Sequence, residues 1–304
     1  MDEPTSEAAG PLLPSLSAYL AQQRAAVEEI LSRRPAPSGE DLHDLRVALR
    51  RTAAVAHLTR GCPLHGGERL RRAARDLRKA LSDRRTTEVS VQLLRERFGR
   101  GERKAAALLV SRAIARRAPP AEHHGAGEAA HRLETLGRAF DRREHDISSL
   151  DPPGAHSGGE GDTPDALLTS RFLRRLDRAR VRLISDGPPG RDGLHPFRIR
   201  ARDLRYGFEL LSETWPAARP AVRSLRELQE AAGAAHDLAE LRAALEALAS
   251  GGGRSRAPAE AKEFLPSVAS AQARAFAAAR RVARTSLAAL EAVPLPGSSP
   301  GQVS

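Results

Sequence analysis

The chain contains very few of the residues from which β-sheets are built. Its 304 residues include 12 Val, 5 Ile and 10 aromatic residues, whereas β-branched and aromatic side chains dominate strands. Leu and Ala supply most of the 40% hydrophobic content, and together with Arg they are strong helix formers. The composition therefore predicts an all-α protein and argues against a sheet-based enzyme fold.

Hydrophobic residues recur at helical spacing along most of the chain, between short breaks rich in Pro and Gly. We expect helices over about residues 12–32, 40–60, 68–98, 103–117, 128–147, 166–185, 193–213 and 259–291, the last interrupted near Pro266. Long helices with short connections are typical of helical bundles. Residues 148–165 contain a Pro-Pro-Gly run and a Gly-rich run, so they are expected to form a flexible linker.

The order of predicted helices and turns before this linker recurs after it. Aligning His43 with His195 also aligns arginines of the two halves at an offset of about 151 residues. An internal duplication of this kind predicts two similar antiparallel bundles related by a pseudo-twofold axis. The predicted organisation is a disordered N-terminus (1–11), a first helical repeat (12–147), the flexible linker (148–165), a second helical repeat (166–292) and a disordered tail (293–304).

The chain is strongly basic, with a formal net charge of +11 and 49 Lys and Arg residues, only three of which are Lys. A GC-rich gene would enrich Arg over Lys, but it would also enrich uncharged Ala and Gly and leaves the charge excess unexplained. A polyanionic partner is therefore the leading expectation.

Cys62 is the only cysteine, which excludes a disulfide within the chain and a cysteine-based zinc site. The acidic N-terminus lacks the apolar stretch of a signal peptide, and no window is apolar enough for a membrane span. We expect a cytoplasmic protein that does not insert into membranes.

Two helical segments carry a stripe of basic residues. At 100° per residue, the second-half stripe of His195, Arg198, Arg202 and Arg205 falls within a wedge of about 80°. The first-half stripe has three members, His43, Arg46 and Arg50. The apolar residues of both segments lie on the opposite side, so each helix can bury its core face without the stripe.

An ordinary solvated helix face is the alternative explanation for such a stripe. Solvated faces usually mix both signs of charge, however, and stacked arginines repel one another. A bound polyanion would reverse that repulsion, and the planar guanidinium group binds phosphate oxygens bidentately. Because the pattern occurs twice, we expect the stripes to bind a polyanion.

The runs His-Asp-Leu-Arg-Val-Ala-Leu-Arg-Arg at 43–51 and His-x-x-Arg-Ile-x-x-Arg-x-Leu-Arg-Tyr-x-x-Glu at 195–209 resemble the two signature helices of the CHAD family, the conserved histidine α-helical domain. The Leu-Gln-Glu-Ala-Ala-Gly-Ala-Ala-His-Asp run at 228–237 is similar to a later helix of that family, and the resemblance covers about residues 12–292. It implies two pseudo-symmetric helical bundles around a basic groove or pore that binds inorganic polyphosphate without catalysis. The residues implied to line it are His43, Arg46, Arg50, Arg72, Arg75, His195, Arg198, Arg202, Arg205, Arg223 and Arg226.

Two positions depart from the family pattern. Ala53 stands where the family usually has another basic residue, and Arg85-Thr-Thr-Glu88 stands where it has an Arg-Asp-x-Asp-like motif. These departures predict weaker binding by the first half than by the second. The Glu-x-Glu-x-Lys motif of triphosphate-tunnel domains is absent from the sequence, so the chain resembles a stand-alone member, and polyphosphate granules are its expected location.

The sequence leaves two other functions as alternatives. His43-Asp44 and His236-Asp237 are reminiscent of metal-dependent phosphohydrolases, but the additional ligands are missing, and we expect no catalysis, cofactor or metal site. Nucleic acid is the alternative binding partner, because an arginine stripe attracts any phosphate backbone. The few aromatic residues offer little surface for stacking unpaired bases. His43 and His195 are expected to take up protons when a polyanion binds.

Overall fold

The computed structural model describes residues 11–32, 38–60, 66–81, 85–117, 126–150, 163–190, 193–251 and 255–296. All regular secondary structure in these ranges is helical, which confirms the all-α prediction. The α-helices are α1 (Leu12–Ser32), α2 (Gly39–Leu58), α3 (Gly67–Ala80), α4 (Arg85–Leu93), α5 (Lys104–Arg117), α6 (Ala126–Leu150), α7 (Pro164–Asp186), α8 (Leu194–Thr214), α9 (Arg219–Ala249) and α10 (Ala257–Glu291). Three short turns complete the set: a π-helical turn η1 (Leu94–Phe98) and the 3₁₀ turns η2 (Gly101–Arg103) and η3 (Pro216–Ala218).

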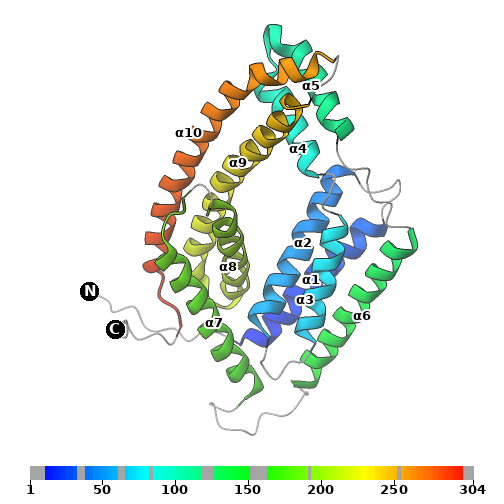
Figure 1. Cartoon of the computed structure of the whole chain (residues 1–304). Helices are drawn as coiled ribbons and strands as arrows, with labels where there is room; N and C mark the ends of the chain where they lie inside the picture. The colour runs from blue at the N-terminus through cyan, green and yellow to red at the C-terminus, as the bar shows by residue number, and fades with distance from the viewer. Residues whose placement is uncertain are drawn as a thin grey trace.

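The two longest helices, α9 and α10, run side by side along one edge of the molecule (Figure 1). Helices α1, α2, α3 and α6 form the opposite side, α7 and α8 lie between the two groups at one end, and α4 and α5 cover the other end. The main core joins α1, α2, α3, α6, α7 and α8 to the start of α9 and the end of α10.

A second core lies at the far ends of α9 and α10. There Leu94, Val110 and Ile114 pack with Leu241 of α9 and Phe264 of α10. Helices α4 and α5 precede the linker, so part of the first half completes the core of the second half. The internal duplication itself stays a prediction.

Local sequence fixes the start of α2. The Ser38 Oγ accepts a hydrogen bond from the backbone N–H of Asp41 at 3.1 Å, and the Asp41 Oδ2 accepts one from the Ser38 N–H at 2.8 Å. This capping box satisfies two backbone donors that a helix end leaves without partners. His43, Arg46 and Arg50 therefore lie on a helix whose register is set at its first turn.

Several predicted boundaries are wrong. The helix expected over 68–98 is divided: α3 ends at Ala80, α4 begins at Arg85 and packs against α9, and the π-helical turn η1 follows α4. Residues 82–84 lie outside the described residues. Helix α10 continues through Pro266 without the expected interruption, since packing along α9 outweighs the loss of one backbone hydrogen bond.

The predicted linker and tail also need correction at their edges. Residues 148–150 belong to α6 and Pro164 begins α7, while residues 151–162 lie outside the described residues. In the expected disordered tail, Val293 and Leu295 are buried in the main core, because their apolar side chains close the end of α10. Residues 1–10 and 297–304 lie outside the described residues.

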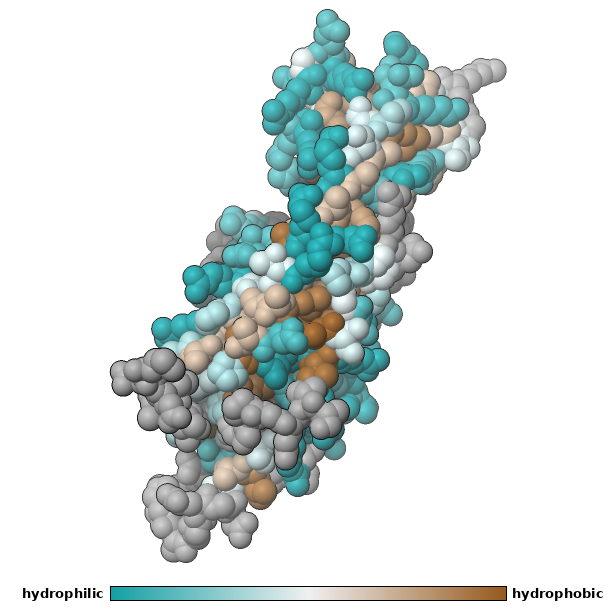
Figure 2. All heavy atoms as spheres, turned by 90° about the vertical axis from the view of Figure 1, so that its left-hand side faces the viewer, coloured by the Kyte–Doolittle hydropathy of each residue, from teal (hydrophilic) through white to brown (hydrophobic). Residues whose placement is uncertain are grey.

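The outer face formed by α7 and α10 mixes hydrophilic residues with apolar ones (Figure 2). Hydrophilic residues prevail at one end of this view, and apolar residues gather nearer the other end. Among the described helices, none combines the length and the hydropathy that a membrane-spanning segment needs.

Candidate polyanion-binding groove

Helices α2, α8 and α9 meet around a cavity of about 360 Å³ that we call the arginine groove. Helices α2 and α8 contribute members of the two predicted stripes, and α9 contributes Arg226. The groove is lined by His43, Val47, Arg50, Arg198, Arg202, Arg205, Tyr206, Arg226, Gln229 and Glu230. Six of the eleven predicted site residues therefore share one cavity, and they come from both halves of the chain.

Arg50 is the most strongly perturbed charge in the groove. Burial is the main cause that lowers the pKa of its guanidinium group to about 10, and the positive charges of Arg202 and Arg46 contribute to the same shift. The nearby Arg78 of α3 is affected in the same way, since burial and the charge of Arg202 lower its pKa. Arginines from three helices thus repel one another at the groove, which is the arrangement that a bound anion would stabilise.

Arg198 has a similar environment on α8. Burial lowers its pKa, the carboxylate of Asp237 acts in the opposite direction, and Arg202 lowers the pKa again. The Nε atoms of Arg50 and Arg198 are buried and have no hydrogen-bond partner among the described residues. The same is true of the Nε atoms of Arg46, Arg51 and Arg205 nearby. A buried donor without a partner is costly, and an oxygen-rich anion bound in the groove would offset part of that cost.

Arg205 is held differently from its neighbours in the stripe. Its Nη1 lies 2.6 Å from the Glu209 Oε1, and the Arg51 Nε of α2 lies 3.3 Å from the Glu209 Oε2. The Arg205 guanidinium also lies over the Tyr206 ring, 4.8 Å from its centroid. Arg205 therefore lines the groove with much of its charge compensated, and Glu209 joins α2 to α8.

Arg202 has a carboxylate partner as well, but a more exposed one. Its Nη2 lies 2.6 Å from the Oδ1 of Asp203, and the Asp203 side chain is 45% exposed. An exposed ion pair of this kind contributes little. Arg202 can therefore turn toward a polyanion at small cost.

Arg226 lies at the exposed margin of the groove. The predicted residues that do not line the groove are Arg46, Arg72, Arg75, His195 and Arg223. Arg46 is buried beside it and donates to the backbone carbonyl of Leu81 at 3.5 Å. Arg72 is exposed and its Nε lies 3.2 Å from Glu68 Oε1. Arg75 and Arg223 are exposed on α3 and α9, although the charge of Arg75 contributes to the lowered pKa of Arg78.

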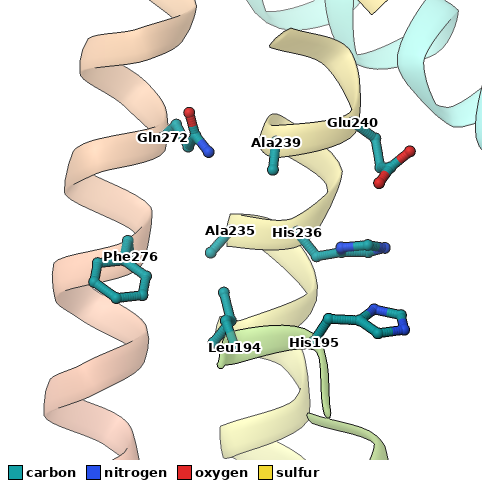
Figure 3. Close-up of a pocket in the computed structure, with 8 residues that line it drawn as sticks. All are labelled: Leu194, His195, Ala235, His236, Ala239, Glu240, Gln272 and Phe276. Carbon is teal, nitrogen blue, oxygen red and sulfur yellow. The ribbon is translucent and has the colours of Figure 1, made fainter. Parts of the chain in front are cut away.

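His195 does not line the arginine groove. It faces His236 of α9, with the two ring centroids 5.0 Å apart and the rings tilted by 41°. Both rings line a neighbouring cavity of about 360 Å³, together with Glu240, Gln272, Phe276 and small apolar residues (Figure 3). Burial and the charge of Arg198 lower the pKa of both histidines.

Sequence reasoning did not assign Arg78, His236 or Tyr206 to the site. Arg78 follows Arg75 by three residues, so helical spacing alone could have added it to the same face of α3. His236 and Tyr206 become part of the site only because helices pack against one another. Among the described residues, no three His, Cys, Asp or Glu side chains gather in a way that could hold a metal ion.

Comparison with known proteins agrees with this architecture. The family model of the CHAD domain matches residues 15–246, which is most of the chain. No curated protein matches it. Among solved structures, the crystal structure of the CHAD domain from the plant Ricinus communis matches with a TM-score of 0.59 and 19% sequence identity, over 95% of each chain. The plant domain and this chain thus share a fold. Because the family model matches most of its length, this chain belongs to the CHAD domain family.

Proposed function

We propose that this protein binds inorganic polyphosphate in the arginine groove and does not catalyse a reaction on it. The observation that carries the proposal is that Arg50 of α2, Arg198 of α8 and Arg226 of α9 line one cavity. The positive charges of Arg202 and Arg46 act on Arg50. Arg198 is affected by Asp237 and by Arg202. A chain of phosphates supplies both hydrogen-bond acceptors and negative charge.

The dimensions of the groove favour a single extended polyanion. A cavity of about 360 Å³ between three helices accommodates a narrow phosphate chain, whereas a nucleic acid duplex would meet the groove only from outside. Among the described residues that line the groove, the aromatic rings are those of His43 and Tyr206, and Tyr206 is already in contact with Arg205. Base stacking of the kind used for single strands therefore has little support here.

Titration of the purified protein with long-chain polyphosphate, pyrophosphate and a DNA duplex at two salt concentrations tests the proposal. With roughly six phosphate contacts, log affinity should fall with log salt at a slope of magnitude about four. Polyphosphate should bind more tightly than DNA at both concentrations. Equal affinity for the two polymers would identify a general anion binder instead.

Variants locate the binding to the groove. The double variant Arg50→Ala/Arg198→Ala should lose most of the affinity, whereas Arg72→Ala/Arg223→Ala removes the same charge from exposed positions outside the groove. Equal losses from the two pairs would contradict the site. Shortening of the polyphosphate during incubation would contradict the non-catalytic part of the proposal. We also propose that the protein acts in the cytoplasm at polyphosphate granules, which imaging of a fluorescent fusion would test.

A further inference from the structure

The histidine pair lies at one end of the basic stripe of α8. His195 is in the first turn of the helix, Arg198 follows one turn later, and Arg202 follows one turn after that. The charge of Arg198 affects the pKa of both His195 and His236. The arginine groove and the histidine pair are therefore electrostatically continuous, and a phosphate chain lying along Arg202 and Arg198 reaches the pair next.

A carboxylate stands beyond the histidine pair. Glu240 is one turn after His236 on α9, and the side chains of His195, His236 and Glu240 project to the same side of that helix, one above the other (Figure 3). The charge of Glu240 acts on both histidines and on Arg198, and Asp237 adds a second negative charge near Arg198 and His236. An internal phosphate of a polyphosphate chain would be repelled at this point.

The two kinds of phosphate in a chain differ at such a position. An internal phosphate has one readily ionised oxygen and no proton to donate near neutral pH. A terminal phosphate has a second ionisation with a pKa near 6, as a phosphomonoester does. A terminal group that keeps this proton can donate it to a carboxylate while its other oxygens accept hydrogen bonds.

We propose that His195, His236 and Glu240 form a subsite for the terminal phosphate of a polyphosphate chain whose following phosphates lie in the arginine groove. The histidines donate to the oxygens of the terminal group, and Glu240 accepts its proton and blocks further extension of the chain. This assignment rests on the proposed function and adds to it a preference for chain ends.

Polyphosphate of one length, with free ends or with both ends blocked by an uncharged amine through a phosphoramidate bond, tests this assignment. The protein should bind the free-ended chain about tenfold more tightly, the effect of losing one charge-assisted contact. Each polyphosphate chain has two ends, so two protein molecules should bind it with the higher affinity, whether the polyphosphate is short or long. Equal affinity for blocked and free chains, or a number of tightly bound protein molecules that grows with chain length, would overturn the end subsite.

Variants separate the subsite from the groove. His236→Gln should lower the affinity for free-ended chains to that for blocked chains and leave the blocked chains unaffected. His145→Gln is the matched control, because His145 is exposed on α6 and lines neither cavity. Glu240→Gln should remove the repulsion of internal phosphates and raise the affinity for blocked chains. A misfolded variant would lose affinity, so this gain cannot result from misfolding.

The outcomes also distinguish this inference from the proposed function. Tight binding of free-ended and blocked chains alike leaves polyphosphate binding in place and removes the end subsite. Failure of the wild-type protein to bind either chain contradicts the proposed function itself, and the end subsite falls with it.

Discussion

The Arg205 Nη1 lies 2.6 Å from the Glu209 Oε1, and both side chains are nearly buried, at 11% and 13% exposure. Glu209 also pairs with Arg51 of α2. The carboxylate therefore connects α2 and α8, the two helices that carry Arg50 and Arg198.

Removing Arg205 should affect stability more than removing another stripe member. Arg205→Ala leaves Glu209 nearly buried and paired with Arg51, and loss of one partner from such a pair costs about 2–3 kcal/mol. Arg202→Ala, whose partner Asp203 is more exposed, should cost less than about 1 kcal/mol. Urea unfolding followed by circular dichroism measures both values, and equal losses would refute the structural role of Arg205.

Arg50 should lower the stability of the folded protein while it contributes to polyphosphate binding. Replacing it by Met removes a partly buried charge with repelling neighbours and nearly keeps the side-chain volume, so the free energy of unfolding should rise by up to about 1 kcal/mol. Affinity for polyphosphate should fall about tenfold. Arg72→Met at an exposed position serves as the control, and a destabilised Arg50→Met protein would argue that Arg50 is structural.

The second half should contribute more to binding than the first. Arg198→Glu reverses a charge whose Nε has no partner among the described residues, and it should weaken polyphosphate binding about ten- to hundredfold. Arg46→Glu should weaken it less, because Arg46 donates to the Leu81 carbonyl beside the groove and does not line it. Titrations at one salt concentration, with the fold checked by circular dichroism, decide between unequal and equal effects.

Stability of the free protein should fall as the pH decreases below about 6.5. Burial is the main cause that lowers the pKa of His57, His195 and His236 in the folded protein. The unfolded chain then binds protons at a higher pH than the folded chain does, so acidification favours unfolding. Thermal unfolding at about pH 7.5 and about pH 5.5 measures this effect.

Polyphosphate should counteract that loss. A bound polyanion raises the pKa values of His195 and His236, so proton uptake should accompany binding and affinity should increase as the pH falls. Calorimetry in two buffers with different ionisation enthalpies counts the protons. Zero uptake near pH 6.5, or the same uptake in His195→Gln/His236→Gln, would contradict this coupling.

Two helix glycines should respond in opposite ways to alanine. A Cβ at Gly207 of α8 would lie 2.5 Å from the Leu176 Cδ1 and 2.7 Å from the Leu58 Cδ1. Gly207→Ala should therefore cost about 1–2 kcal/mol through overpacking between α8, α7 and α2. A Cβ at Gly137 of α6 meets nothing within 4 Å, so Gly137→Ala should stabilise the protein by up to about 1 kcal/mol. A stabilised Gly207→Ala variant would show that these leucines can move.

Much of the fold was predictable from the sequence because its signals are local. Scarcity of β-branched and aromatic residues predicted helices, and helical spacing predicted that Arg198, Arg202 and Arg205 share a face. The Arg205–Glu209 pair is also visible as an i, i+4 spacing. The Pro266 prediction failed because a local rule was applied where long-range packing against α9 decides.

Other features of the site depend on contacts that no single segment encodes. Arg51 reaches Glu209 across two helices, His236 meets His195 across the α8–α9 hairpin, and α4 and α5 complete the core of helices from the other half. Spacing within a helix determines which side chains share a face. Only the packing of helices determines which faces meet, because the charge and burial of a side chain depend on neighbours that are distant in the chain.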